Sequence, residues 1–185
     1  MMIKICGITR REDAVAALEA GASAIGFVFY PQSPRYITPE RAAVLGDGLN
    51  LWKVGVFVDE SPVTVEAVMR AAHLDVAQIY GATTPEGVRV WKAYRVADSF
   101  TSPPPGAEAV LLDGAKSGVS FDWRLARGVA EKVIVAGGLS ASNVAEAIRL
   151  AQPWGVDASS QLESAPGIKD HDKVRAFVKA AREAA

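Results

Sequence analysis

Sulfur and imidazole are scarce in this chain, which has one cysteine and two histidines among its 185 residues. A single thiol excludes an internal disulfide and any metal site built from several thiolates. The sequence also has no histidine pair at ligand spacing and no G-x-S-x-G turn around a serine nucleophile. We therefore expect neither a metal site nor an acyl-enzyme.

Clustered positive charge and long apolar runs are also missing. The formal net charge is -1, and lysine and arginine form no run, so the chain lacks the electrostatic footprint that nucleic acid or an anionic membrane requires. The apolar stretch 20–30 is much shorter than the roughly 20 residues that span a membrane. The N-terminus, Met1-Met2-Ile3-Lys4, lacks the pattern of a secretion signal. We expect a cytoplasmic protein whose partner is a small molecule.

Short runs of β-branched, aromatic and other apolar residues alternate with alanine- and glutamate-rich segments of helical length. Several of these runs are almost continuously apolar, as is typical of parallel strands that are covered by helices. We identify eight candidate strands: Ile3–Cys6, Ala24–Phe29, Trp52–Val58, Val76–Ile79, Ala93–Ala97, Ala109–Leu112, Val133–Val135 and Gly155–Ala158.

Eight strand–helix units without a long linker predict an α/β protein, a small (β/α)8 TIM barrel that forms a single domain over residues 1–185. The chain is shorter than the roughly 200 residues usual for this fold, so some connections must be reduced. We expect a reduced fifth helix in segment 101–107, because its prolines 103–105 cannot form an ordinary helix. An open doubly wound sheet is the alternative, but it lacks a G-x-G-x-x-G loop after the first strand.

Serine or threonine, with proline or glutamate close behind, marks the expected helix starts, because the hydroxyl can accept an unpaired backbone N–H. Such starts occur at Thr9, Thr38, Ser61 and Thr84, and Ser140 is expected to open the seventh helix. Gly21 is expected to close the first helix. Segment Lys169–Ala181 has the apolar stripe of an amphipathic helix, formed by Val174, Phe177, Val178 and Ala181.

Cys6 ends the first strand, at the end of the barrel where the loops of TIM barrels build the active site. A lone cysteine on an apolar strand is often an inert core residue. Lys4 lies two residues earlier on the same strand face, where its ammonium would favour the reactive thiolate. Alternatively, Lys4 forms only a structural ion pair with Asp157 on the neighbouring eighth strand. We interpret Cys6 as a candidate general base.

Asp113 follows the apolar run Val110–Leu112, at the end of the sixth strand and across the barrel from Cys6. Taken alone, such an aspartate is as easily the cap of a turn. A base and an acid on opposite sides of a pocket are what a proton-shifting isomerisation requires. The pair therefore indicates isomerase chemistry more strongly than either residue does alone.

The loops after strands seven and eight contain Gly137-Gly138 and Ser159-Ser160. β/α barrels commonly bind phosphate in these two loops through free backbone N–H groups, although a diglycine turn also occurs without a ligand. We therefore predict a phosphorylated ligand at Gly137, Gly138, Ser159 and Ser160. Arg35, in Ser33-Pro-Arg35, either binds a ligand carboxylate through two hydrogen bonds or forms a surface salt bridge.

Two motifs near the N-terminus are specific, Lys4-Ile-Cys-Gly-Ile-Thr9 and Ser33-Pro-Arg-Tyr-Ile37. Weaker ones follow in order along the chain: Val54-Gly-Val-Phe-Val58, Leu111-Leu-Asp113, Phe121-Asp-Trp123, Gly137-Gly138, Gly155-Val-Asp157 with Ser159-Ser160, and Pro166-Gly-Ile-Lys-Asp170. Together they span essentially the whole chain and resemble the phosphoribosylanthranilate isomerase family.

The resemblance implies a cofactor-free Amadori rearrangement in tryptophan biosynthesis, from N-(5'-phosphoribosyl)anthranilate to 1-(2-carboxyphenylamino)-1-deoxyribulose 5-phosphate. It makes Asp113 the general acid that protonates the ribose ring oxygen and Cys6 the general base that removes the C2' proton. It also assigns Arg35 to the anthranilate side, Asp157 to substrate hydroxyls, and Gly138 and Ser160 to the phosphate. The family includes monomers, dimers and fusions, so both a monomer and a homodimer fit.

Three features depart from the family pattern: Tyr80 stands where histidine is usual, Gln161 where glycine is usual, and the loop 114–120 is short. Two other functions therefore stay open. One is the related ribose-phosphate isomerase of histidine biosynthesis, which has aspartate in place of Cys6. The other is a phosphate-binding barrel without catalysis, which Gln161 and the short loop would suit.

Overall fold

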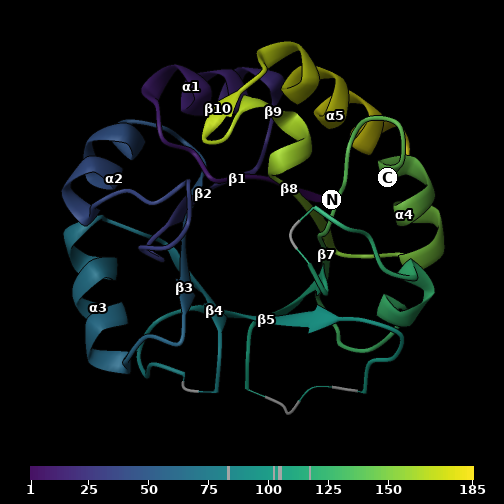
Figure 1. Ribbon diagram of the computed structural model, residues 1–185, viewed down its shortest axis with the longest axis horizontal. Coiled ribbons are helices and arrows are strands. Elements are labelled where there is room, and N and C mark those ends of the chain that lie inside the picture. The colour runs from purple at the N-terminus through teal and green to yellow at the C-terminus, as the bar shows by residue number, and fades with distance from the viewer. Residues whose placement is uncertain (83, 102, 104–105, 117) are drawn as a thin grey trace.

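The computed structural model describes residues 1–82, 84–101, 103, 106–116 and 118–185. Its centre is a closed barrel of parallel strands, in which β1 pairs with both β2 and β8 (Figure 1). The strands follow chain order around the barrel: β1 (Met2–Cys6), β2 (Ala24–Val28), β3 (Trp52–Val58), β4 (Val76–Tyr80), β5 (Val90–Val96), β6 (Ala109–Gly114), β7 (Val133–Val135) and β8 (Gly155–Ala158). The predicted α/β barrel is confirmed, and the open sheet is wrong.

In the part of the chain that the structure describes, the α-helices cover only part of the barrel's outer surface. Figure 1 shows α1 to α3 on one flank and α4 and α5 on the other, with no helix outside β4 and β5. The α-helices are α1 (Arg11–Ala20), α2 (Pro39–Gly46), α3 (Pro62–Ala71), α4 (Val144–Ala151) and α5 (His171–Glu183). The smaller elements are the 3-10 helices η1 (Trp123–Ala126) and η2 (Ser160–Leu162) and an antiparallel hairpin of β9 (Glu163–Ala165) and β10 (Ile168–Lys169).

Several of the expected helix ends are confirmed. The hydroxyl of Thr38 accepts a hydrogen bond from the backbone N–H of Arg41 at the start of α2, and Ser61 accepts one from Thr64 at the start of α3. Gly21 closes α1 in the left-handed conformation, with φ 91°. The predicted apolar stripe of α5 is fully buried.

The expected helix at Thr84 is wrong. Strand β5 begins at Val90 rather than at Ala93, and the described residues between Tyr80 and Val90 contain no helix. This connection is shorter than the dozen or so residues that a helical crossover between parallel strands needs. The fifth helix is reduced as expected: residues 97–101, 103 and 106–108 contain none, while 102, 104 and 105 of the proline segment lie outside the described residues.

Two other expected helix starts are also wrong. The N-cap of α1 is Arg10, whose side chain makes no capping bond. The hydroxyl of Thr9 does not cap the helix but donates to the carbonyl of Gly167. Helix α4 begins at Val144, one turn after Ser140. The side chain of Asn143 accepts the Ser140 backbone N–H at 2.8 Å, so the residues between them form a separate turn.

The interior of the barrel changes character along its axis. The part nearer the amino ends of the strands is packed with apolar side chains, among them Met2, Val54, Trp91, Leu111 and Ile134. The buried polar residues of β1, β4 and β8 lie further along these strands, toward their carboxyl ends: Lys4, Gln78 and Asp157. A larger apolar core lies between strands and helices. Among the described helices, none has the length and apolar character needed to cross a membrane.

Candidate active site

A cavity at the carboxyl end of the barrel brings together nearly all the residues singled out from the sequence. Its lining includes Cys6, Asp113, Gly137, Gly138, Asp157, Ser159 and Ser160. The remaining lining residues are Val56, Gln78, Tyr80, Gly118, Ala136, Leu139 and Gln161. Cys6 and Asp113 therefore face one shared space from β1 and β6.

Lys4 and Asp157 form a buried ion pair across the closure of the barrel. The Nζ of Lys4 lies 2.8 Å from Oδ2 of Asp157, and the two residues are partners in the β1–β8 register. Burial opposes the charge on Lys4, but Asp157 and Cys6 outweigh it, so the pKa of Lys4 lies above its ordinary value. The other oxygen of Asp157, Oδ1, is buried and has no hydrogen-bond partner in the described part of the chain.

The thiol of Cys6 is buried, with 8% of the residue exposed. Burial is the largest influence and raises its pKa, Lys4 lowers it, and Asp157 raises it again; the result lies above the ordinary value for cysteine. Lys4 thus acts in the expected direction, but burial outweighs it. At neutral pH the cavity therefore holds mainly the neutral thiol.

Asp113 has close neighbours from two other strands. Tyr80 on β4 donates its hydroxyl proton to Oδ2 of Asp113 at 3.1 Å, and Nη1 of Arg95 on β5 lies 3.5 Å from the same oxygen. Burial raises the pKa of Asp113, Arg95 lowers it, Asp157 raises it, and the Tyr80 hydroxyl and the Gly114 N–H lower it. The net effect is a pKa above the ordinary value, which favours a proton donor.

The two glycines after β7 occupy positions that other residues would not tolerate. Gly137 and Gly138 have φ of 87° and 65°, in the left-handed region. A Cβ on Gly138 would lie 2.7 Å from the carbonyl oxygen of Gly118, and one on Gly137 would lie 2.6 Å from the Gly114 nitrogen. The backbone therefore packs closely here and lines the cavity without side chains, as a phosphate-binding loop requires.

The loop after β8 is joined to the end of β1 by a hydrogen bond. The Ser159 hydroxyl donates to the carbonyl of Cys6 at 3.0 Å, and both Ser159 and Ser160 line the cavity. Gln161 also lines the cavity, so the side chain that departs from the family pattern lies within the site.

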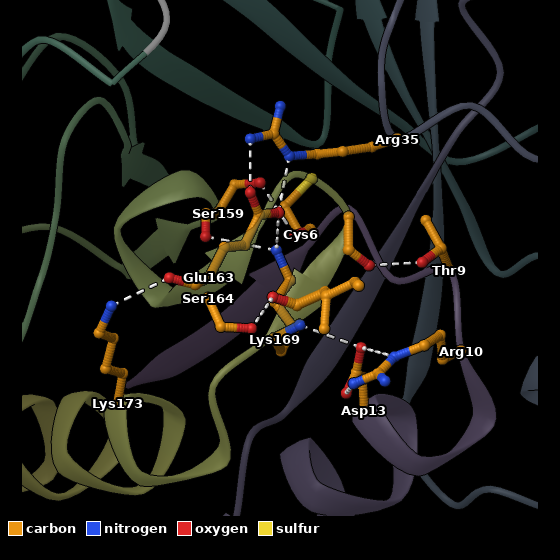
Figure 2. A network of polar contacts seen from close by, with 12 residues as sticks. Cys6, Thr9, Arg10, Asp13, Arg35, Ser159, Glu163, Ser164, Lys169 and Lys173 are labelled. Atoms are coloured by element: carbon orange, nitrogen blue, oxygen red, sulfur yellow. Dashed lines mark hydrogen bonds and ion pairs between the residues drawn. The ribbon is translucent and has the colours of Figure 1, made fainter.

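Arg35 is placed differently from the other candidates, because it does not line the cavity. Figure 2 shows its side chain extending over Cys6 to Glu163, which it binds through two hydrogen bonds. Its Nε and Nη2 lie 2.8 and 2.7 Å from the two carboxylate oxygens. Arg35 therefore forms an ion pair in the structure, but a largely buried one rather than the surface salt bridge that was the alternative, and Nη1 is not used in this pair.

Sequence reasoning missed the groups that hold these candidates in place. Glu163 also accepts a hydrogen bond from the buried Lys169 at 2.7 Å, so one carboxylate joins the Arg35 loop to the β9–β10 hairpin (Figure 2). Gln78 and Tyr80 alternate on β4 and both face the cavity. The predicted strand Val76–Ile79 includes Gln78 but stops one residue before Tyr80, and Glu163 lies in a segment with no regular pattern.

The chain matches the family model described as N-(5'phosphoribosyl)anthranilate (PRA) isomerase over residues 3–180. It is 50% identical to the N-(5'-phosphoribosyl)anthranilate isomerase of Solibacter usitatus, with all of this chain and 98% of the relative aligned. The phosphoribosyl anthranilate isomerase structure from Thermus thermophilus superposes with a TM-score of 0.91 and 38% identity over 99% of both chains. A structure of the isomerase with reduced 1-(o-carboxyphenylamino)-1-deoxyribulose 5-phosphate gives 0.87 and 36%, with the same coverage.

Proposed function

Because this chain belongs to the phosphoribosylanthranilate isomerase family, we propose that Cys6 and Asp113 are the base and the acid of its reaction. The protein is an isomerase of tryptophan biosynthesis, which carries out the Amadori rearrangement of N-(5'-phosphoribosyl)anthranilate. The observation that supports the two roles is the shared cavity, which a thiol and a carboxyl group enter from β1 and β6.

The two groups divide the reaction into two proton transfers. Asp113 gives its proton to the ring oxygen of the ribose, and the bond from that oxygen to C1' breaks to leave an iminium between C1' and the anthranilate nitrogen. The thiolate of Cys6 then removes the C2' proton, and the electron pair neutralises the iminium as an enolamine. Tautomerisation oxidises C2' to a ketone while C1' is reduced, so the redox change is internal and needs no external oxidant.

The reaction requires Cys6 as thiolate and Asp113 as acid, which is the minor protonation state of the free site. Burial raises the pKa of both groups, and we infer that Asp113 remains the more acidic one, because a carboxyl group ordinarily titrates near ~3.9 and a thiol near ~8.5. The product of the two required fractions is constant between these pKa values and falls outside them. We therefore expect a bell-shaped profile of kcat/KM with Asp113 on the acid limb and Cys6 on the alkaline limb.

The other substrate contacts follow from unused groups around the cavity. Oδ1 of Asp157 can accept a sugar hydroxyl, since it is buried without a partner. Arg35 keeps its Nη1 edge for the anthranilate carboxylate while Glu163 holds the opposite edge. The phosphate would lie at Gly137, Gly138, Ser159 and Ser160. We also propose a cytoplasmic location, because the one free thiol suits a reducing compartment.

An assay of phosphoribosylanthranilate turnover, monitored through the loss of the substrate's fluorescence, tests the two roles. We expect Cys6→Ala and Asp113→Asn each to lower kcat by at least ~100-fold, the lower end for a positioned acid or base. Asp122→Asn is the matched control, because this exposed carboxyl lies outside the cavity, where it caps η1 and pairs with Arg124. Near-normal turnover in either cavity variant rejects that residue's role. Stoichiometric binding by the unmodified protein without loss of fluorescence would instead indicate a non-catalytic barrel.

A further inference from the structure

In the described part of the chain, the side chains of Tyr80 and Arg95 both contact the same oxygen of Asp113, while the backbone N–H of Gly114 also favours its carboxylate. Oδ2 accepts the Tyr80 hydroxyl at 3.1 Å and faces the Arg95 guanidinium at 3.5 Å. Arg95 in turn lies over the Tyr80 ring, 5.3 Å from its centroid, and its Nη1 also donates to the Gly114 carbonyl at 3.4 Å. Tyr80 and Arg95 therefore support each other as well as the carboxyl group.

The direction of the Tyr80 proton is constrained from the other side. The amide nitrogen of buried Gln78 points at the Tyr80 oxygen at 3.5 Å, a long contact in which the phenol can only accept. A phenol has one proton, so Tyr80 gives it to Asp113. The pKa of Tyr80 lies well above its ordinary value, mainly through burial and then through Asp113, so the hydroxyl keeps this proton across the working pH range.

The two oxygens of Asp113 therefore differ in their surroundings. Oδ2 accepts one donor and faces a cation, so a proton placed there would compete with both. Oδ1 lies on the side of Gly137, where an ideal Cβ would be 3.2 Å away, and Gly137 lines the cavity. The carboxylic acid proton is better placed on Oδ1, beside the space for the substrate.

We propose that Tyr80 and Arg95 are positioning residues that fix Oδ2 of Asp113 and leave Oδ1 to deliver the proton. The inference rests on the proposed role of Asp113 as the general acid. It also explains why tyrosine can stand at position 80, where histidine is usual in the family. Both side chains can donate a hydrogen bond from this point on β4.

The charged and titratable groups near Asp113 come from four strands. Tyr80 lies on β4, Arg95 on β5 and Asp157 on β8, while Cys6 on β1 acts on Tyr80. Arg95, Tyr80 and the backbone N–H of Gly114 stabilise the carboxylate, whereas burial and Asp157 oppose it. Removal of the Tyr80 hydroxyl therefore moves the pKa of Asp113 upward, and Asp113 remains protonated to higher pH.

The first test is a titration of the Asp113 carboxyl carbon by ¹³C NMR, with Asp113→Asn used to assign its signal. We expect Tyr80→Phe and Arg95→Gln each to raise the pKa of Asp113 and Tyr80→His to return it toward the starting value. Tyr94→Phe, which removes a hydroxyl from β5 outside the cavity, is the matched control and should leave it unchanged. An unchanged titration in both Tyr80→Phe and Arg95→Gln overturns the proposal.

The second test separates positioning from a simple change in proton affinity. In Tyr80→Phe the acid limb of the kcat/KM profile should move to higher pH. The higher pKa of Asp113 would, by itself, increase the protonated fraction of the acid and so raise the plateau of kcat/KM. We expect the plateau instead to fall about tenfold, equivalent to about 1.4 kcal/mol, and to recover in Tyr80→His. A plateau that is unchanged or raised shows that Tyr80 does not position the acid. If the unmodified protein has no turnover, the proposed function fails, while the NMR titration still tests the contact.

Discussion

At the scale of single residues, Cys6 shows how far neighbouring groups determine the chemistry of a side chain. Lys4 lies on the same strand face and favours the thiolate, as its spacing predicted. The same Lys4 is bound by Asp157 at 2.8 Å, and that anion disfavours a second negative charge beside it. The ion pair and the tuning of the thiol are therefore one arrangement rather than alternatives.

Alkylation of Cys6 by iodoacetamide as a function of pH measures this balance. In the unmodified protein the midpoint should lie above the ~8.5 of a free cysteine, because burial raises the pKa of the thiol. Lys4→Met should move the midpoint further up, since the cation that favours the thiolate is lost. Asp157→Asn should move it down, since the opposing anion is lost. Unfolding would move the midpoint of both variants in the same direction, toward that of a free cysteine. Opposite shifts therefore support this account, and shifts in the same direction contradict it.

At the scale of elements, the β9–β10 hairpin connects the last βα unit to the loop that carries Arg35. Glu163 binds Arg35 on one side and Lys169 on the other, and the Lys169 side chain is completely buried. Lys169 also donates to the Ser159 carbonyl at 3.3 Å, within the loop expected to bind phosphate. One carboxylate thus joins the proposed anthranilate side of the site, at Arg35, to the proposed phosphate side, at Ser159.

Glu163→Gln should therefore reduce both stability and substrate binding. Breaking a buried ion pair by removal of one charge costs about 3–5 kcal/mol, and Arg35 loses the partner that orients it, so KM should rise. Urea unfolding and steady-state kinetics measure the two effects. Glu108→Gln is the matched control, because Glu108 is also bound by an arginine through two bonds and by Lys132, but at an exposed position. Exposed pairs contribute about 0–1 kcal/mol, and an equal loss in the two variants would contradict the buried role of Glu163.

The elements also show what the sequence could and could not predict. Local signals sufficed where a helix starts at its own cap, as at Thr38 and Ser61. They failed at Thr84, where the length of the connection excludes a helix, and at Thr9, where a carbonyl from the distant Gly167 takes the hydroxyl. The family resemblance supplied Asp157, and the strand-end rule supplied the other six candidate residues that line the cavity. It could not place Arg35 or reveal Glu163, because their pairing joins residues far apart in the chain.

At the scale of the whole molecule, closure of the barrel joins the beginning of the chain to its end. β1 pairs with β8, α5 packs on α1, and the Lys4–Asp157 ion pair lies within the β1–β8 seam. Every strand of the barrel has two hydrogen-bonded neighbours, so there is no free edge in the described sheet at which it could separate. This continuity supports a single domain over residues 1–185.

A single domain should unfold at both ends of the barrel together. Trp52, Trp91 and Trp154 pack on one another near the amino ends of the strands, and Cys6 lies at the opposite end. We therefore expect the fluorescence of these three tryptophans, measured in a Trp123→Phe background because Trp123 lies in η1, and the reactivity of the Cys6 thiol to report the same urea midpoint. Phe177→Ala, in the buried stripe of α5, should lower the free energy of unfolding by about 3–5 kcal/mol and move both midpoints equally. A closed sheet cannot lose one end while the other keeps its register. Separate midpoints for the two probes, or a shift of only one of them, would therefore mean that the two ends of the barrel belong to different folding units.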